Sequence, residues 1–121
     1  MIDKYKQVVN LLLKLTSGGS QIWEKTSGNE YKTNIGNNYI SIRYHEAIIH
    51  AIQANSNPDS TYVDLLLWNE NGEIIDKINA TKGTIDFQSL FELYEEARRS
   101  FGQVYERLDE IIFDLNGKLG E

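Results

Sequence analysis

One feature limits what this chain can fold into more than any other: an unbroken apolar stripe along its last third. Large apolar side chains recur there at alternating spacings of three and four residues, which is the spacing of one face of an α-helix. The heptads stay in phase and predict a single amphipathic helix over residues 86–116. The stripe keeps its phase across Gly102, so we expect the helix to continue through that residue, with Asp86 as its N-cap and Gly117 as its C-cap. The stripe consists of Phe87, Leu90, Tyr94, Ala97, Phe101, Val104, Leu108, Ile111 and Leu115.

The length of this helix raises the question of what covers its stripe. About 30 residues at 1.5 Å each span about 45 Å, whereas a strand of seven residues spans roughly 23 Å. A sheet alone therefore leaves part of the stripe uncovered if the helix runs along a strand. A second helix, a diagonal path across several strands or a second chain would cover the rest. We expect a protein partner or a second copy, as a homodimer, at the far half of the helix, and the possible interface residues are Leu108, Ile111, Ile112 and Leu115.

A shorter helix is predicted near the start of the chain, over residues 3–16. Asp3 is its expected N-cap, and Gly18-Gly19 is expected to end it. The helix is about 20 Å long and has an apolar stripe of its own, so it offers one cover for the long helix.

Between the two helices the apolar pattern changes to the alternation that is typical of β-strands. Ile40, Ile42 and Tyr44, for example, alternate with polar residues. Asn71-Gly72 is the strongest of several hairpin-turn signals, and residues 55–60 are expected to form a loop. The region therefore predicts an antiparallel meander of about five or six strands. The runs that carry the pattern are 22–26, 31–35, 40–44, 62–68 and 73–78, and 62–68 is apolar on both faces, which predicts a central strand covered on both sides.

Together these elements predict an α+β fold in a single domain, residues 1–121. It has a short N-terminal helix, an antiparallel β-meander and a long C-terminal helix packed on one sheet face. With 121 residues, 40% of them apolar, the chain is long enough to bury a core without disulfides or a structural metal.

The net charge, the length of the apolar runs and the absence of cysteine exclude several classes of partner and of catalytic site. The net charge of −6 argues against a nucleic-acid partner, because phosphate binding needs clustered positive charge. No run approaches the roughly 18 apolar residues of a spanning helix, and the first apolar run lacks a signal-peptide cleavage site. We therefore expect a cytoplasmic protein that does not contact membranes. The chain has no cysteine, which excludes disulfides, thiolate metal sites and a cysteine nucleophile.

The stretch around His45, Glu46 and His50 is the part of the sequence that comes nearest to a catalytic motif. A metalloprotease helix places two histidines four residues apart, so that both bind one zinc ion. His45 and His50 are five apart, which separates them by roughly 140° on a helix and places them on opposite faces of a strand. Only a turn between them, for example at Tyr44-His45-Glu46, would let both histidines bind one metal ion. We expect no metal site, no cofactor and no catalytic residues.

Two further sets of side chains are candidates for function. Asp64 is the one acid in the Leu-rich strand, and it becomes interesting if it is buried. Aromatic residues are frequent in the predicted sheet, and several on one face would form a binding face. The alternative is that they are core residues and cross-strand pairs. The candidates for an aromatic binding face are Trp23, Tyr31, Tyr62 and Trp68.

Three functional hypotheses follow. The first, which we favour, is a non-enzymatic interaction or regulatory protein that acts through its long C-terminal helix and aromatic sheet face. The second is a small-molecule or lipid-binding carrier with a pocket between sheet and helix, lined by residues such as Phe91, Tyr94, Phe101 and Tyr105. The third is an enzyme that uses His45 or His50 with Asp64 or Glu46.

Overall fold

The computed structural model of this protein describes residues 1–46 and 61–120. In this part of the chain two helices flank five strands, and the strands pair in one antiparallel sheet in their sequence order. The predicted α+β fold, with its meander and its long C-terminal helix, is confirmed. The elements are α1 (Asp3–Ser17), β1 (Glu24–Ser27), β2 (Glu30–Ile35), β3 (Asn38–His45), β4 (Tyr62–Trp68), β5 (Ile74–Thr81) and α2 (Ile85–Leu119).

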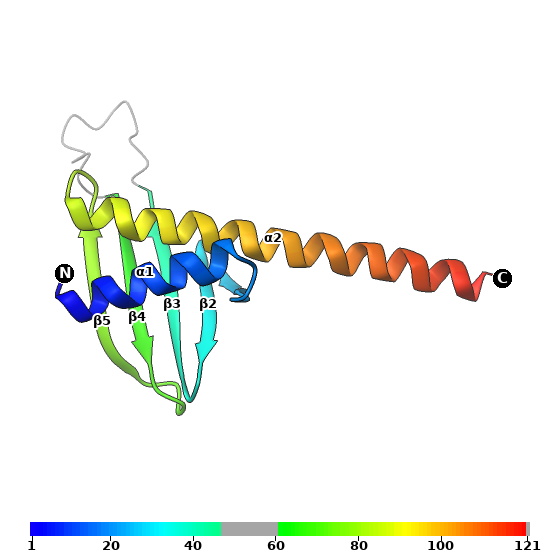
Figure 1. Ribbon diagram of the computed structural model, residues 1–121, viewed down its shortest axis with the longest axis horizontal. Helices are drawn as coiled ribbons and strands as arrows, with labels where there is room; N and C mark the ends of the chain where they lie inside the picture. Colours follow the sequence, from blue (N-terminus) through cyan, green and yellow to red (C-terminus); the bar gives the residue numbers. More distant parts are fainter. Residues whose placement is uncertain (47–60, 121) are drawn as a thin grey trace.

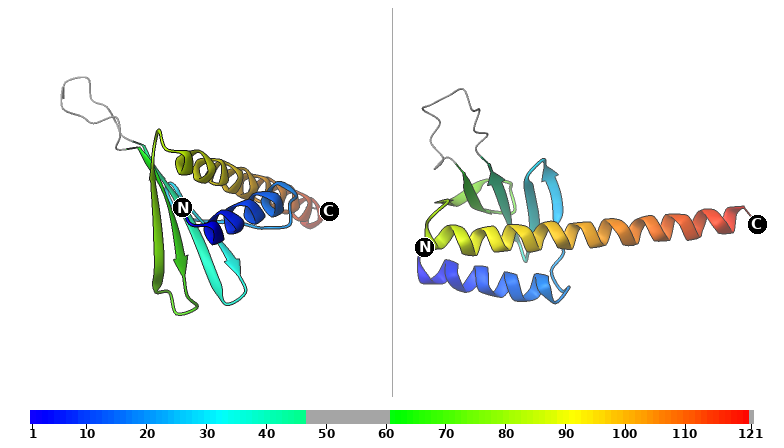
Figure 2. Two further views of the ribbon diagram at one scale, coloured as in Figure 1. Left: turned by 60° about the vertical axis from the view of Figure 1, so that its left-hand side comes forward. Right: turned by 90° about the horizontal axis from the view of Figure 1, so that it is seen from above.

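Both helices lie on the same face of the sheet (Figures 1 and 2). They run side by side in the same direction, and α2 crosses the strands instead of following one of them (Figure 1). Five strands spaced about 4.8 Å apart make a sheet roughly 20–24 Å wide. A helix that crosses this width rests on the sheet for only part of its length.

The core lies between the sheet and the two helices. The register pairs Ile42 with Leu65 and Leu65 with Ile78, so that a row of apolar side chains crosses β3, β4 and β5 on the helical side. On α2, Leu90 and Leu93 are completely buried. The buried apolar residues of this core are Val9, Leu12, Trp23, Tyr31, Ile40, Ile42, Val63, Leu65, Ala80, Leu90, Leu93, Tyr94 and Ala97.

Tight turns fix the register of the hairpins. Gly36 and Gly72 have φ values of 59° and 80°, a left-handed conformation that glycine adopts without a Cβ clash. In the β4–β5 turn, the Asn69 side-chain oxygen accepts hydrogen bonds from the backbone N–H groups of Asn71 and Glu73. The hairpin predicted at Asn71-Gly72 is confirmed.

The N-terminal ends of both helices correct the sequence predictions. Asp3 is not the N-cap of α1, because Ile2 occupies that position and makes no side-chain capping bond. Asp86 is not the N-cap of α2, because Thr84 is, with its hydroxyl accepting from the Phe87 N–H at 3.3 Å. Both aspartates lie in the first turn of their helix, where the positive end of the helix dipole stabilises a carboxylate.

At its other end α2 is longer than predicted. Gly117 lies within the helix and Gly120 is the C-cap, so the prediction for Gly117 was wrong. The helix is continuous through Gly102, as predicted, and contains 35 residues, or about 52 Å. Neither α1 nor α2 combines the length and the apolar character of a membrane-spanning helix.

Strand β4 is buried on both faces, as predicted, but within the described residues a helix covers only one of them. Val63 and Leu65 face the helices. Asp64 and Leu66 face the opposite side, yet only 0% and 3% of their surface is exposed. Their cross-strand neighbours on β3 and β5 are Arg43 and Asn79 for Asp64, and Ser41 and Lys77 for Leu66.

Candidate interaction surface

The second half of α2 extends beyond the sheet (Figures 1 and 2). The last aromatic contact between α2 and the sheet joins Phe101 to Tyr31 on β2, with ring centroids 5.8 Å apart. From Tyr105 to the end of the helix every described residue is exposed. We call residues 104–119 the projecting segment, and the rest of the described chain the body. At 1.5 Å per residue the projecting segment is about 24 Å long.

The projecting segment presents the same helix face that the body buries. Eighteen residues make five complete turns of an α-helix, so Leu108 lies at the same angle around the axis as Leu90. Leu90 is completely buried, whereas Leu108 is 52% exposed. The same shift relates Leu93 to Ile111, Tyr94 to Ile112, Ala97 to Leu115 and Phe101 to Leu119.

The apolar stripe therefore continues with no change of direction into a region where the described residues do not cover it. Ile111, Ile112 and Leu115 are 53%, 55% and 55% exposed, and Leu119 is 85% exposed. We call these residues, with Leu108, the projecting stripe. Single exposed apolar residues are ordinary on protein surfaces, but a contiguous row of them is typical of an interaction site.

The two flanks of the projecting stripe differ. Arg107 and Asp114 lie on one flank, about 100–120° from Leu108. On the other flank the apolar residues Tyr105 and Ile112 lie about 40–60° from Leu108, and Asp109 lies beyond them at about 100°. Sequence analysis identified Leu108, Ile111, Ile112 and Leu115 as interface candidates, and the structure brings these four together. Sequence analysis did not single out the flank with Arg107 and Asp114, although the heptad positions of these two residues would have revealed it.

The four residues predicted to form an aromatic face do not share one face. Trp23 and Tyr31 are buried on the helical side, and the Trp23 indole N–H donates to the Thr16 hydroxyl at 2.9 Å. Tyr62 and Trp68 lie on the helix-free face. Each stacks on its cross-strand neighbour: Trp68 on Tyr39 and Tyr62 on His45, with centroids 5.4 and 4.8 Å apart.

Asp64 is the centre of a polar network on the helix-free face. Its carboxylate accepts from Arg43 and from Asn79, both at 2.8 Å, and Lys77 Nζ lies 3.7 Å away. The Trp68 indole N–H donates to buried Ser41 at 2.9 Å on the same face. Asp64 is therefore buried and fully paired, which is the arrangement of a structural carboxylate.

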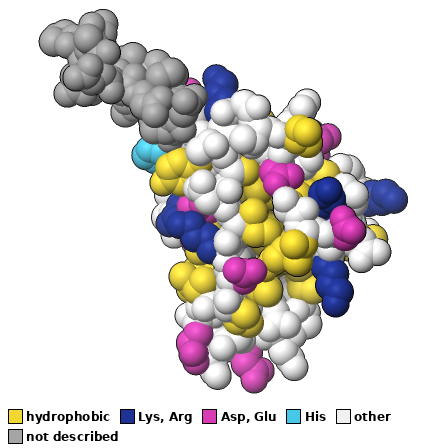
Figure 3. Space-filling view, turned by 90° about the vertical axis from the view of Figure 1, so that its left-hand side faces the viewer, with side chains coloured by type: hydrophobic (Ala, Val, Ile, Leu, Met, Phe, Trp, Pro, Cys, Tyr) yellow, Lys and Arg dark blue, Asp and Glu magenta, His cyan; other side chains and the backbone are white. Residues whose placement is uncertain are grey.

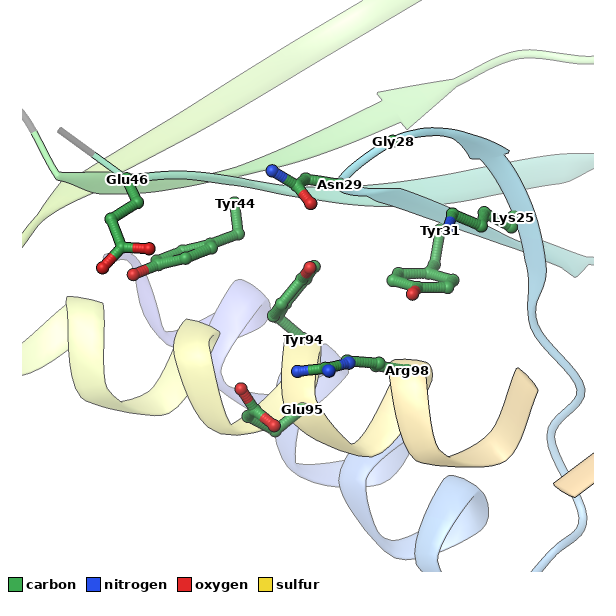
Figure 4. Close-up of a pocket in the computed structure, with 9 residues that line it drawn as sticks. All are labelled: Lys25, Gly28, Asn29, Tyr31, Tyr44, Glu46, Tyr94, Glu95 and Arg98. Carbon is green, nitrogen blue, oxygen red and sulfur yellow. The ribbon is translucent and has the colours of Figure 1, made fainter. Parts of the chain in front are cut away.

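A pocket of about 320 Å³ lies at one edge of the sheet–helix interface (Figure 4). Tyr31 and Tyr44 enter it from the sheet, and Tyr94 and Arg98 from α2. Burial raises the pKa of Tyr44 and of Tyr94, with smaller contributions from neighbouring groups. These phenols therefore remain hydrogen-bond donors well above neutral pH. The other lining residues are Lys25, Gly28, Asn29, Glu46 and Glu95, and of the whole pocket sequence analysis had named only its tyrosines and Glu46.

The histidines offer no metal site in the described structure. His45 is at the end of β3 with its ring against Tyr62, and His50 lies outside the described residues. The loop predicted at 55–60 lies outside them as well. Within residues 1–46 and 61–120 no three His, Asp or Glu side chains are grouped so that they could hold a metal ion.

The surface carries charges of both signs. On the end of the molecule shown in Figure 3, basic, acidic and hydrophobic side chains are interspersed, and neither charge forms a continuous patch. A nucleic-acid site would need such a basic patch, and this end does not provide one.

The comparisons with known proteins give no match: no family model, no curated protein and no solved structure is significantly similar to this chain.

Proposed function

We propose that this protein is a non-enzymatic interaction protein whose body holds out the C-terminal half of α2 as a docking element for a protein α-helix. The observation that carries this proposal is the repeat of the buried face of Leu90, Leu93 and Tyr94 as the exposed face of Leu108, Ile111 and Ile112. A stripe of this width and spacing fits another amphipathic helix, by ridges and grooves of side chains.

The energetics support a partner. Fully burying a Leu or Ile side chain stabilises by about 1.5–3 kcal/mol, and the projecting stripe leaves much of this stabilisation unused in the isolated chain. A helix that docks along the stripe would bury the apolar side chains and stabilise the segment.

The test asks whether the projecting stripe is needed for the fold. The double variant Leu108→Glu/Ile112→Glu is compared with Leu90→Glu, its equivalent five turns earlier. Thermal unfolding is followed at low protein concentration by the near-ultraviolet signal of Trp23 and Trp68, which both lie in the body. We expect the double variant to melt within a few degrees of the wild type, and Leu90→Glu to be unfolded, because it places a charge in the core.

Glu106→Gln, on the opposite side of the projecting segment, is the matched control and should not change the melting temperature. If Leu108→Glu/Ile112→Glu unfolds the body as Leu90→Glu does, the stripe belongs to the core of this chain and the docking proposal is wrong.

A second candidate function is a carrier for a small polar molecule, and the observation that favours it is the tyrosine pocket beside Arg98 and Lys25. Glu46 and Glu95 balance the two cations, so the pocket suits a small zwitterion better than a simple anion. A lipid ligand is less well supported, because Leu90, Leu93 and Ala97 on the body half of α2 have no exposed surface. Titration of glycine or a similar amino acid against the wild type and Arg98→Met, with binding heat as the readout, tests this function. Absence of wild-type heat, or equal heat in both proteins, would rule it out for that ligand.

A further inference from the structure

We infer that the helix docked on the projecting stripe is the same segment of a second copy of this chain, running antiparallel to the first. This inference rests on the proposed function and names its partner. Three observations carry it: the position of the body relative to the stripe, the charges on one flank, and the apolar side chains next to the stripe on the other flank.

The position of the body excludes a parallel pair. The stripe faces the same side of α2 as the sheet, because Leu108 repeats the direction of Leu90. In a parallel dimer both bodies would lie at the same level along the paired helices. Each body would also lie on the side of its own α2 where the other chain packs. The two chains would therefore collide. In an antiparallel dimer the bodies lie at opposite ends of the paired helices. The partner's helix then ends near Phe101, where the sheet begins to cover the stripe.

The flank that carries Arg107 and Asp114 is self-complementary in the antiparallel arrangement only. Antiparallel helices bring the same flank of both copies together, whereas parallel helices bring opposite flanks together. When Leu108 packs beside the partner's Ile111, Arg107 lies beside the partner's Asp114, and the twofold axis generates a second such pair. Flanking charges of this kind determine the orientation of paired helices.

The other flank leads to the same orientation. In the antiparallel pair Tyr105 meets the partner's Ile112, so that apolar side chains contact each other. In a parallel pair Arg107 would meet the partner's Ile112, and Asp114 would meet the partner's Leu119. Each contact would place a charge against an apolar side chain and remove solvent from it, which is unfavourable.

Disulfide trapping tests both the partner and the orientation. The chain has no cysteine, so an introduced thiol reports only on the chosen position. In the antiparallel pair Val104 lies opposite the partner's Leu115, whereas the two copies of Val104 are about 17 Å apart along the axis. A disulfide requires Cα atoms about 4.4–6.8 Å apart.

We expect Val104→Cys alone and Leu115→Cys alone to remain uncrosslinked under mild oxidation, and an equimolar mixture to give a covalent dimer. A mixture of Leu115→Cys with Glu106→Cys, whose thiol lies on the opposite side of the helix, is the control and should not crosslink. Sedimentation of the wild type at about 100 µM accompanies the trapping and should show a dimer, as expected for an affinity on the order of micromolar.

The other outcomes overturn the inference. Crosslinks within each single variant, with no gain on mixing, would show a parallel pair. A wild-type dimer that traps in no combination would show an interface elsewhere. A wild-type monomer at about 100 µM would show that the second copy is not the partner. This last result would leave the docking proposal standing if Leu108→Glu/Ile112→Glu still spares the body, so the two failures are distinguishable.

Discussion

Arg43 and Asp64 face each other across β3 and β4, with the guanidinium Nη2 2.8 Å from the carboxylate Oδ2. Their exposure is unequal: the Asp64 side chain is completely buried, whereas 41% of the Arg43 side chain reaches solvent. The hydrogen bond to Asp64 raises the pKa of Arg43. The arginine therefore acts as a charged cover over the carboxylate, on the face of the sheet that carries no helix in the described structure.

Replacing Arg43 should destabilise the protein because it leaves a buried carboxylate without its principal partner. We expect Arg43→Met to lower the free energy of unfolding by about 1–3 kcal/mol, since Asn79 still donates to Asp64 but Lys77 is 3.7 Å away. Urea denaturation at neutral pH measures the change. Lys32→Met is the matched control: Lys32 lies over the Tyr39 ring, and we expect its loss to cost less than about 0.5 kcal/mol. Equal effects of the two variants would contradict the role given to Arg43.

The Tyr5 hydroxyl donates to Asp76 at 2.6 Å and joins α1 to β5. Burial, together with this hydrogen bond, raises the pKa of Tyr5 to about 12, and the same bond lowers the pKa of Asp76. An unfolded tyrosine ionises near pH 10, so the folded protein binds the proton more tightly between pH 10 and 12. The stability from Tyr5 is therefore complete below pH 10 and is lost as the pH rises toward 12.

Urea denaturation at intervals from pH 8 to pH 11.5 should show this loss in the wild type. In Tyr5→Phe we expect lower stability at pH 8 and a shallower decline above pH 10. Tyr105→Phe, at a 60% exposed position of the projecting segment, should follow the wild-type curve. A wild-type slope in Tyr5→Phe would show that other groups cause the alkaline loss. At the acidic end the lowered pKa of Asp76 predicts the opposite sign, with stability lost as the pH falls below about 4.

Gly102 lies where α2 leaves the sheet, and a Cβ added there meets no heavy atom within 4 Å. Glycine inside a helix costs roughly 0.5–1 kcal/mol relative to alanine. We therefore expect Gly102→Ala to stabilise the helix by about that amount. Far-ultraviolet circular dichroism should show more helix, and amide exchange should be slower after residue 102.

Gly72→Ala is the control for Gly102→Ala, and we expect it to have the opposite effect on stability. Gly72 has a φ of 80°, which an alanine side chain disfavours, so this variant should be less stable than the wild type. If Gly102→Ala also loses stability, the backbone at Gly102 has a role that its helical geometry does not show.

Much of this fold could be predicted because its signals are local and periodic. The stripe from Phe87 to Leu115 determines a helix by its spacing alone, and Asn71-Gly72 determines a hairpin because few other dipeptides fit the turn. Helix caps were harder to predict. An aspartate such as Asp3 or Asp86 is favourable both at an N-cap and in the first turn of a helix, and a glycine such as Gly117 ends many helices but is tolerated inside others at a cost of about 1 kcal/mol. The residues at which a helix begins and ends depend on which nearby groups bond the free backbone amides and carbonyls. At the N-terminus of α2 the Thr84 hydroxyl does so.

The parts that could not be predicted depend on contacts between distant strands. Alternation shows that Tyr31 and Tyr62 lie on faces of the sheet, but it does not show which face each strand turns to the helices. The pairing of Asp64 with Arg43 requires the register between β3 and β4. The exposure of Leu108 depends on how far the sheet and α1 extend along α2, which the spacing of the stripe alone does not show.

The two charges on the flank of the projecting stripe allow a charge exchange between copies. Arg107→Asp leaves two acids on this flank, and Asp114→Arg leaves two bases. In an antiparallel dimer each variant alone places like charges opposite each other at both symmetric contacts, which should weaken self-association by about tenfold. A mixture of the two variants restores opposite charges at both contacts. We therefore expect a heterodimer with about the wild-type affinity, measured by energy transfer between labelled copies.

Changes within each helix, such as the lost attraction between Arg107 and Glu110, are the same in the mixture and in the single variants. The difference in affinity between the mixture and the single variants therefore reports only on the contact between chains. The difference should shrink in about 1 M salt, where screening reduces the range of charge interactions to about 3 Å. If mixing brings no gain in affinity at low salt, Arg107 does not lie beside the partner's Asp114, and the antiparallel arrangement is wrong.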